Sequence, residues 1–295
     1  MNMAYFNGVY VALVTPFDQT HEVDYQRLRE LCEWLIGQGV DGLIPGGSLG
    51  EYATLNSDER AQVVETVIET ANGRVPVMVG TGAPSTQQVI QWAEHAKQVG
   101  AAGIMALPPI NYNPMKHEII AHYEALSKVG LPVIAYNNPH DYPTDLTPAL
   151  LEEISRFDNI VGVKEFSGDI RRVHDILEKT TLEVMIGVDD LAFEGALAGA
   201  TGWISGVPNA LPKEGSALFR YGRNGEVEDG LALYRKLLPL FHYDAQPQLV
   251  QSIKYMLELA GQDCGSTRPP RLPLPTEMYE KIKADFHYAK ETSYS

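Results

Sequence analysis

The apolar residues follow two patterns that alternate along most of the chain. Short continuous apolar runs, such as residues 9–15, are typical of strands buried on both faces of a parallel sheet. Between the runs, apolar residues recur three and four positions apart, as at Leu28, Leu31, Cys32 and Leu35, which is the period of an amphipathic helix. The alternation predicts eight strands, each followed by a helix: residues 9–15, 40–45, 75–81, 103–107, 132–137, 160–165, 184–188 and 202–205.

Eight strand–helix units favour a closed barrel over an open sheet. Open doubly wound sheets usually have fewer strands, and no Gly-x-Gly-x-x-Gly motif follows the first predicted strand. We therefore predict an α/β fold, a (β/α)8 TIM barrel over residues 1–224. Helical apolar stripes continue beyond it, so residues 225–295 are predicted to form a C-terminal extension of three helices that packs on the barrel or on a neighbouring subunit.

The composition of the chain limits the classes of partner that it can bind. The chain has 23 Lys and Arg against 38 Asp and Glu, a net charge of −15, which argues against nucleic acid or an anionic membrane as a partner. The first residues lack the basic and apolar regions of a signal peptide, and no window has 18 uninterrupted apolar residues, so we expect a soluble, cytoplasmic protein. Cys32 and Cys264 match no zinc or redox spacing, and Cys32 is predicted to be a buried thiol.

Lys164 ends the sixth predicted strand, after the apolar run 160–163 and before Glu165. A buried lysine that has no partner has a lowered pKa, and its neutral amine is a nucleophile that can form a Schiff base with a carbonyl. Alternatively, its stem lines the strand while the ammonium reaches solvent, or it pairs with Glu165. Of the eleven lysines, Lys164 alone lies at the C-terminal end of a predicted strand, where barrels of this type bind substrate, which favours the Schiff-base role.

Other predicted strand ends carry polar groups that could act with this lysine. Tyr136 ends the preceding strand, so its phenol could transfer protons at the same rim, or it could simply cover the barrel core. The turn 46–50 offers backbone N–H groups and the hydroxyl of Ser48 to a carboxylate, although glycines after a strand are also ordinary turn residues. Asp189 and Asp190 are interpreted as a helix N-cap, because no histidine or carboxylate cluster at other strand ends accompanies them as metal ligands.

Four segments, residues 47–51, 136–139, 161–165 and 202–206, resemble in order and spacing the dihydrodipicolinate synthase / N-acetylneuraminate lyase family of Schiff-base barrels. The resemblance implies that Lys164 forms the Schiff base and that Tyr136 transfers protons. It also implies that Ser48 and the Leu49 backbone N–H bind the carboxylate of an α-keto acid, that the protein is a homotetramer, and that it uses no metal or organic cofactor. The predicted substrate-binding residues are Gly47, Ser48, Leu49, Asn138, His140, Ile204 and Gly206.

Departures from the family pattern bear on the substrate. Where dihydrodipicolinate synthases have an arginine that holds the carboxylate of the aldehyde substrate, this chain has Asp141. Their paired threonine is replaced by Ser48 and Leu49, and the tyrosine of their relay is out of step at Tyr112. A synthase of the lysine pathway is therefore disfavoured.

Segments 136–139, 162–168, 208–214 and 244–251 look most like deaminases of hydroxyproline breakdown, which convert Δ1-pyrroline-4-hydroxy-2-carboxylate to 2,5-dioxopentanoate and ammonia. The alternatives are an aldolase or dehydratase acting on a 2-keto-3-deoxy sugar acid and a synthase-like aldol condensation with pyruvate. A phosphate-binding barrel is a further reading, but the glycines of 199–202 precede their strand and should lie at the wrong face. A barrel that only binds or regulates is the non-enzymatic reading.

Overall fold

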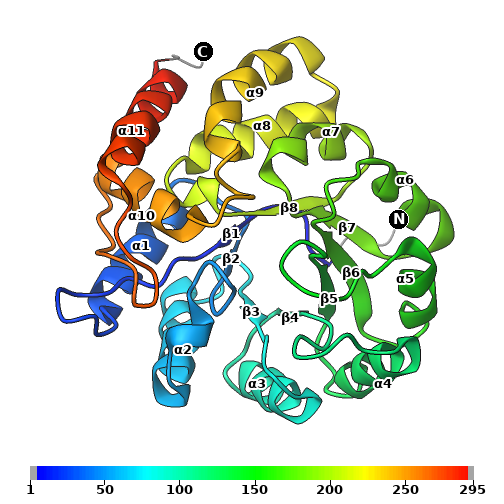
Figure 1. The fold of residues 1–295 in the computed structure, drawn as a ribbon. Coiled ribbons are helices and arrows are strands. Elements are labelled where there is room, and N and C mark those ends of the chain that lie inside the picture. Colours follow the sequence, from blue (N-terminus) through cyan, green and yellow to red (C-terminus); the bar gives the residue numbers. More distant parts are fainter. Residues whose placement is uncertain (1–4, 292–295) are drawn as a thin grey trace.

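The computed structural model describes residues 5–291 and confirms the predicted (β/α)8 barrel (Figure 1). Residues 1–4, part of the N-terminal stretch considered above, and residues 292–295 lie outside the described part. The strands are β1 (Gly8–Ala12), β2 (Gly42–Ile44), β3 (Met78–Gly80), β4 (Gly103–Ala106), β5 (Val133–Asn137), β6 (Ile160–Glu165), β7 (Glu183–Ile186) and β8 (Gly202–Ser205).

The strands form one parallel sheet in the order β2-β1-β8-β7-β6-β5-β4-β3. Its two ends meet, because Leu43 forms a parallel bridge with Val77 and the Gly80 N–H donates to the Pro45 carbonyl over 2.9 Å. β2 and β3 are shorter than predicted. The chain leaves the sheet after β2, because Pro45 has no N–H for a sheet hydrogen bond and Gly46 has a φ of +73°.

Helices surround the strands, as Figure 1 shows. Cys32 is a buried thiol, as predicted. Asn56 and Glu59 form a capping box at the start of the second helix. The barrel helices are α1 (Tyr25–Gly37), α2 (Ser57–Ala71), α3 (Thr86–Gln98), α4 (Lys116–Ser127), α5 (Pro148–Ile154), α6 (Arg171–Lys179), α7 (Ala192–Leu197) and α8 (Pro212–Asn224), with the 3-10 turns η1 (Tyr52–Thr54), η2 (Asp189–Leu191) and η3 (Val207–Asn209).

The interpretation of Asp189 and Asp190 as a helix N-cap is wrong. The segment starts as the 3-10 turn η2, where neither side chain makes a capping bond, and α7 begins at Ala192. The Asp189 carboxylate turns inward and accepts hydrogen bonds from Trp203 Nε1 over 3.0 Å and from the Val207 N–H over 3.4 Å. Because a buried carboxylate requires such donors, Asp189 serves the barrel interior rather than the helix end.

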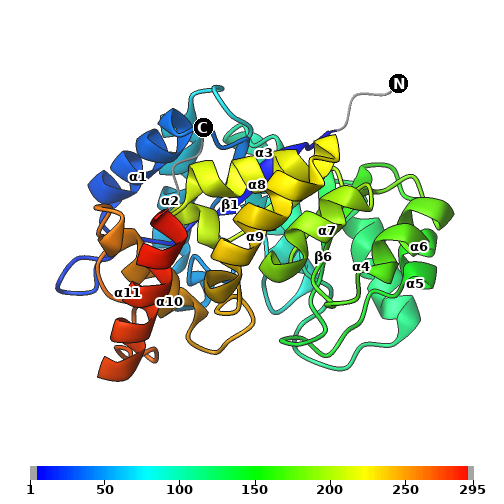
Figure 2. The same cartoon turned by 90° about the horizontal axis from the view of Figure 1, so that it is seen from above.

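Three helices follow the barrel: α9 (Val227–Phe241), α10 (Leu249–Leu259) and α11 (Thr276–Lys290). In both views α9 lies along α8, and α10 and α11 lie together at the side of the barrel near α1 (Figures 1 and 2). The division into residues 1–224 and 225–295 stays a prediction. No helix of the described residues is long and apolar enough to cross a membrane.

Candidate active site

Lys164 lies near the C-terminal end of β6 with 7% of its surface exposed. It is in register with Tyr136 on β5, and its Nζ lies 4.3 Å from the centroid of the tyrosine ring. A Cβ at Gly187 would lie 3.0 Å from the lysine Cε, so a residue without a side chain leaves room for the lysine stem. Among residues 5–291, no hydrogen bond or ion pair reaches the amine.

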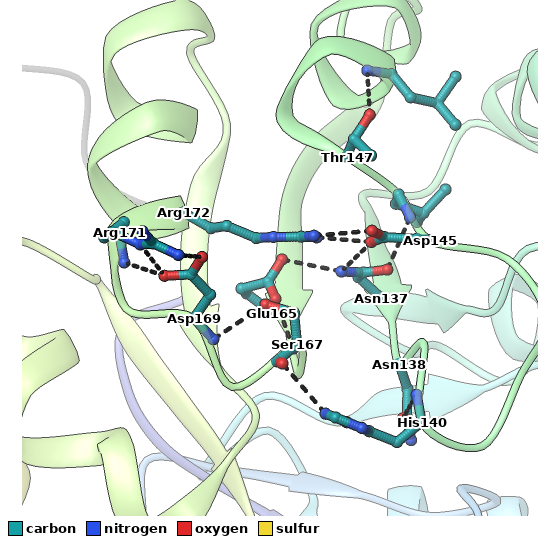
Figure 3. A network of polar contacts seen from close by, with 12 residues as sticks. Asn137, Asn138, His140, Asp145, Thr147, Glu165, Ser167, Asp169, Arg171 and Arg172 are labelled. Atoms are coloured by element: carbon teal, nitrogen blue, oxygen red, sulfur yellow. Dashed lines mark hydrogen bonds and ion pairs between the residues drawn. The ribbon is translucent and has the colours of Figure 1, made fainter.

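The alternative pairing of Lys164 with Glu165 is absent from residues 5–291, and Figure 3 shows Glu165 beside Asn137 and Ser167. Successive side chains of a strand point to opposite faces, and Glu165 faces away from the lysine. Its carboxylate accepts hydrogen bonds from Asn137 Nδ2 over 3.1 Å and from the Ser167 N–H over 2.6 Å. Glu165 therefore ties β6 to β5 and to the following loop and leaves Lys164 unpaired.

Beside this carboxylate, an ion pair links the loop after β5 to α6 (Figure 3). Both terminal guanidinium nitrogens of Arg172 donate to Asp145, over 2.6 and 2.8 Å, and Asn137 also donates to Asp145 over 3.3 Å. These contacts hold the ends of β5 and β6, and hence Tyr136 and Lys164, in a fixed relation.

The Lys164 amine faces a small inner cavity of about 60 Å³ at the C-terminal ends of the strands. An outer cavity of about 750 Å³ shares Ser48, Leu49, Asp141 and Asp244 with it and is open to solvent. The inner cavity is lined by Ala12, Gly47, Ser48, Leu49, Met105, Tyr136, Asn138, Asp141, Lys164, Phe166, Ile204, Gly206, Asp244 and Leu249.

An amide connects the phenol to a carboxylate. Asn138 Nδ2 donates to Tyr136 Oη over 3.1 Å and to Asp141 Oδ2 over 2.9 Å. Burial raises the pKa of Tyr136 well above its usual range. The phenol is therefore protonated at neutral pH and can donate a proton before it accepts one.

The turn after β2 presents Ser48 to the cavity. Its hydroxyl lies 3.1 Å from the hydroxyl of Tyr142, which follows β5, and burial raises the pKa of that phenol. A Cβ at Gly206 would lie 3.0 Å from a methyl of Leu49, so Gly206 gives this turn its space. Tyr112, the residue out of step with the family relay, is 80% exposed, and Tyr142 provides the phenol beside Ser48 instead.

Two buried carboxyls stand near the lysine. Asp244, from the loop between α9 and α10, lines both cavities, whereas Asp189 is fully buried behind them and donates its backbone N–H to Asp244 Oδ2 over 3.2 Å. Burial raises the pKa of Asp244 to about 7 and also raises that of Asp189. Burial lowers the pKa of Lys164, and the carboxyls of Asp244, Asp189 and Asp141 oppose that shift.

The structure brings most of the predicted site residues together. Gly47, Ser48, Leu49, Tyr136, Asn138, Lys164, Ile204 and Gly206 line the inner cavity. His140 is exposed, lies 3.1 Å from the Ser167 carbonyl and lines only the outer cavity. No role was predicted for Tyr142, Phe166 or Asp244. Asp244 begins segment 244–251 of the deaminase resemblance, but no local pattern places it in the site, since only the return of the helical extension over the barrel brings it to the inner cavity.

The described residues contain no group of three or more His, Cys, Asp or Glu side chains that could hold a metal ion. The polar groups of the inner cavity are instead one amine, a phenol, a hydroxyl, an amide and two carboxyls. Such a set can form a covalent bond with a carbonyl and move protons around it.

The family model described as "Dihydrodipicolinate synthetase family" matches residues 5–289. The chain belongs to this family. The 4-hydroxy-tetrahydrodipicolinate synthase of Methanospirillum hungatei JF-1 is 36% identical over 286 residues, 94% of this chain and 97% of that relative.

Solved structures agree in fold with this family assignment. The chloride-inhibited dihydrodipicolinate synthase of Acinetobacter baumannii, complexed with pyruvate, is 31% identical, with a TM-score of 0.91 over 97% of this chain and 99% of that one. A prophage protein of the dihydrodipicolinic acid synthase family from E. coli K12, also in complex with pyruvate, is 29% identical, with a TM-score of 0.92 and coverage of 97% and 99%. The resemblance read from the sequence is thus confirmed for the family, and membership supports an enzymatic role.

Proposed function

We propose that the protein is a lyase that forms a Schiff base between Lys164 and a small 2-keto acid or the equivalent cyclic imine. The observation that carries the proposal is the buried, unpaired Lys164 amine, which shares a cavity with the Tyr136 phenol. Since burial lowers the pKa of this lysine, the neutral, nucleophilic form is more accessible than in water. Ser48 and the Leu49 N–H hold the substrate carboxylate at the other side of the cavity.

The charges of the inner cavity support a substrate with a single carboxylate. Lys164 is its one cationic side chain within the described residues, and Asp141 and Asp244 are its acids. A second carboxylate, such as that of the aldehyde substrate of a lysine-pathway synthase, would meet Asp141 rather than an arginine. An amino group would be attracted there.

These charges favour Δ1-pyrroline-4-hydroxy-2-carboxylate as substrate. Lys164 attacks C2 of the cyclic imine, and the ring opens as the ring nitrogen leaves C2, giving a Schiff base whose chain ends in an amine. Asp141 and Asp244 suit that amine. The protonated Schiff base acidifies C3–H, Tyr136 or a water relays this proton, and the C4 hydroxyl leaves as water, which gives a C3=C4 double bond. Protons then move from C5 and its amine to C3 and C4, so that the amine becomes a C5 imine. Hydrolysis of this imine frees ammonia, and hydrolysis of the Schiff base frees 2,5-dioxopentanoate from Lys164.

The second candidate is an aldolase or dehydratase of a 2-keto-3-deoxy sugar acid, which would use the same lysine and tyrosine. The outer cavity favours it, because about 750 Å³ exceeds the needs of a five-carbon substrate and His140 and Asp190 line it. A synthase-like condensation with pyruvate is the third, since the relative from Methanospirillum is named for it. The predicted homotetramer stays part of this proposal.

One comparison of substrates separates the three reactions. Purified protein is incubated with Δ1-pyrroline-4-hydroxy-2-carboxylate, with a 2-keto-3-deoxy sugar acid, or with pyruvate and aspartate semialdehyde. Ammonia release from the first substrate supports the deaminase. Pyruvate release from the second, or consumption of pyruvate in the third, with no ammonia from the first, would overturn it in favour of the corresponding alternative.

A further inference from the structure

Asp244 is the buried acid of the inner cavity, and the mechanism above gives it no step of proton transfer. It reaches the barrel from the loop between α9 and α10 and is 8% exposed. It lines the inner cavity together with Lys164 and the outer cavity that leads to solvent. A group in this place can meet the substrate on one side and exchange protons with water on the other.

Its hydrogen bonding leaves one oxygen free for the substrate. Oδ2 accepts the Asp189 N–H over 3.2 Å, and within the described residues no other hydrogen bond reaches this carboxyl. Asp189 differs in this respect, because Trp203 and the Val207 N–H bind its carboxylate and it lines neither cavity. Of the two buried acids, only Asp244 is open to a ligand.

The proposed reaction requires an acid at this point. Hydroxide is a poor leaving group, so loss of the C4 hydroxyl needs a proton donor near C4, which lies two carbons beyond the Schiff-base carbon. Tyr136 lies against Lys164 and is occupied with the proton of C3. A second donor must stand farther along the chain of the substrate.

We propose that Asp244 is the catalytic acid that protonates the C4 hydroxyl as it leaves, an inference that rests on the proposed deaminase reaction. After loss of the C3 proton, the lysine nitrogen lone pair forms the C2=N bond, and the C2=C3 electron pair moves to C3=C4. The C4–O bond breaks with its electrons on oxygen, which takes the Asp244 proton and departs as water. Asp244 is left as a carboxylate and regains a proton from solvent in the outer cavity.

The ionisation of Asp244 agrees with this role. Burial is the main cause of its raised pKa, and the nearby acids Asp190 and Asp141 add to it, whereas Lys164 opposes it. Asp189 faces it from η2, and His140 and Arg271 share its outer cavity. A substantial share of Asp244 is therefore protonated at neutral pH, where an ordinary aspartic acid has lost its proton.

The test separates removal of the C3 proton from loss of the C4 hydroxyl. Asp244→Asn is compared with wild type and with Asp190→Asn, a matched carboxyl that lines only the outer cavity. We expect Asp244→Asn to lower kcat for ammonia release about 10²- to 10⁴-fold, the usual contribution of a general acid. It should still form a borohydride-stable adduct with pyruvate and exchange the pyruvate methyl protons in D₂O. Asp190→Asn should keep kcat for ammonia release near the wild-type value and move the pH profile slightly to lower pH, because Asp190 adds to the raised pKa of Asp244.

Each other outcome has a distinct meaning. A higher KM with unchanged kcat and pH profile in Asp244→Asn would overturn the acid role, since Asp244 would then only bind the substrate. If Asp244→Asn lost both the pyruvate adduct and the proton exchange, Asp244 would act on Lys164 rather than on the C4 hydroxyl, and the acid role would be overturned.

If Asp244→Asn does not fold, the pH dependence of the wild-type protein tests the acid role of Asp244. The rate of ammonia release should fall as the pH rises through neutrality, whereas deuterium exchange into pyruvate should not, and parallel profiles would contradict the inference. Absence of ammonia release from wild type that still forms the adduct would overturn the substrate, and this inference with it, while keeping the Schiff base.

Discussion

Among residues 5–291 two lysines are buried, one in the barrel and one in the C-terminal helices, and their surroundings differ. Lys164 on β6 faces a cavity and has no hydrogen-bond or ion-pair partner among the described residues. Lys254 on α10 is 4% exposed, lies 3.2 Å from Glu51 and donates to the Ser266 carbonyl over 2.8 Å. Burial lowers the pKa of both, but Glu51 stabilises the ammonium of Lys254 directly.

The comparison teaches that burial alone does not make a lysine a nucleophile. The ion pair of Lys254 with Glu51 holds the C-terminal helices to the turn after β2. Glu51 closes that turn with a left-handed φ of 54°, and its carboxylate also accepts the Arg268 N–H over 3.1 Å. Its amine is committed to this ion pair. Lys164 has a similar burial, but an open cavity and aromatic rings replace the partner, so its amine remains available to a substrate.

The largest effect is expected for Lys164→Met. Turnover should fall on the order of 10⁴-fold or more, as for other lost nucleophiles, and steady-state kinetics measures it. The free energy of unfolding should stay the same or rise, since an unpaired buried amine is replaced by an apolar side chain of similar length. A variant that kept wild-type turnover would remove the distinction between the two lysines.

The next effect concerns the phenol beside Lys164. Tyr136→Phe keeps the ring below the amine but removes the hydroxyl that Asn138 contacts. We expect kcat to fall about 10²- to 10⁴-fold, while the Schiff base still forms. Borohydride trapping with pyruvate measures Schiff-base formation and ammonia release from the pyrroline substrate measures kcat, and an unchanged kcat would exclude the phenol from proton transfer.

Glu51→Gln tests the other lysine. It leaves the Lys254 ammonium buried without its counter-charge, so the free energy of unfolding should fall by about 3–5 kcal/mol in urea titrations. The double variant Glu51→Gln, Lys254→Met should recover much of that loss, because the unpaired charge is gone. A loss below about 1 kcal/mol for Glu51→Gln would mean that the pair does not hold this region.

The smallest effect is expected for Tyr142→Phe. The variant loses one neutral hydrogen bond to Ser48, worth about 0.5–1.5 kcal/mol, so KM for the keto acid should rise about 2- to 10-fold with little change in kcat. Initial rates over a range of substrate concentrations measure this. A large fall in kcat would instead give Tyr142 a part in proton transfer.

The sequence predicts the barrel and the centre of the site because both follow from local patterns. The apolar run that ends at Lys164 and the position of Tyr136 one strand earlier are enough to place amine and phenol at one rim. The sequence did not predict the places of the two buried carboxyls, Asp189 and Asp244. Asp189 looked like a helix cap, since the donors that turn it inward, Trp203 and the Val207 N–H, come from a later part of the chain. Asp244 depends on the path of the C-terminal helices.

The most direct test of the central claim is to trap the Schiff base. Wild type is incubated with pyruvate and borohydride, digested, and mapped by mass spectrometry, with Lys164→Met as the matched variant. The account predicts one reduced pyruvate adduct on Lys164, no adduct on Lys254, and none in the Lys164→Met variant. An adduct on another lysine, or none in folded wild type, would contradict it.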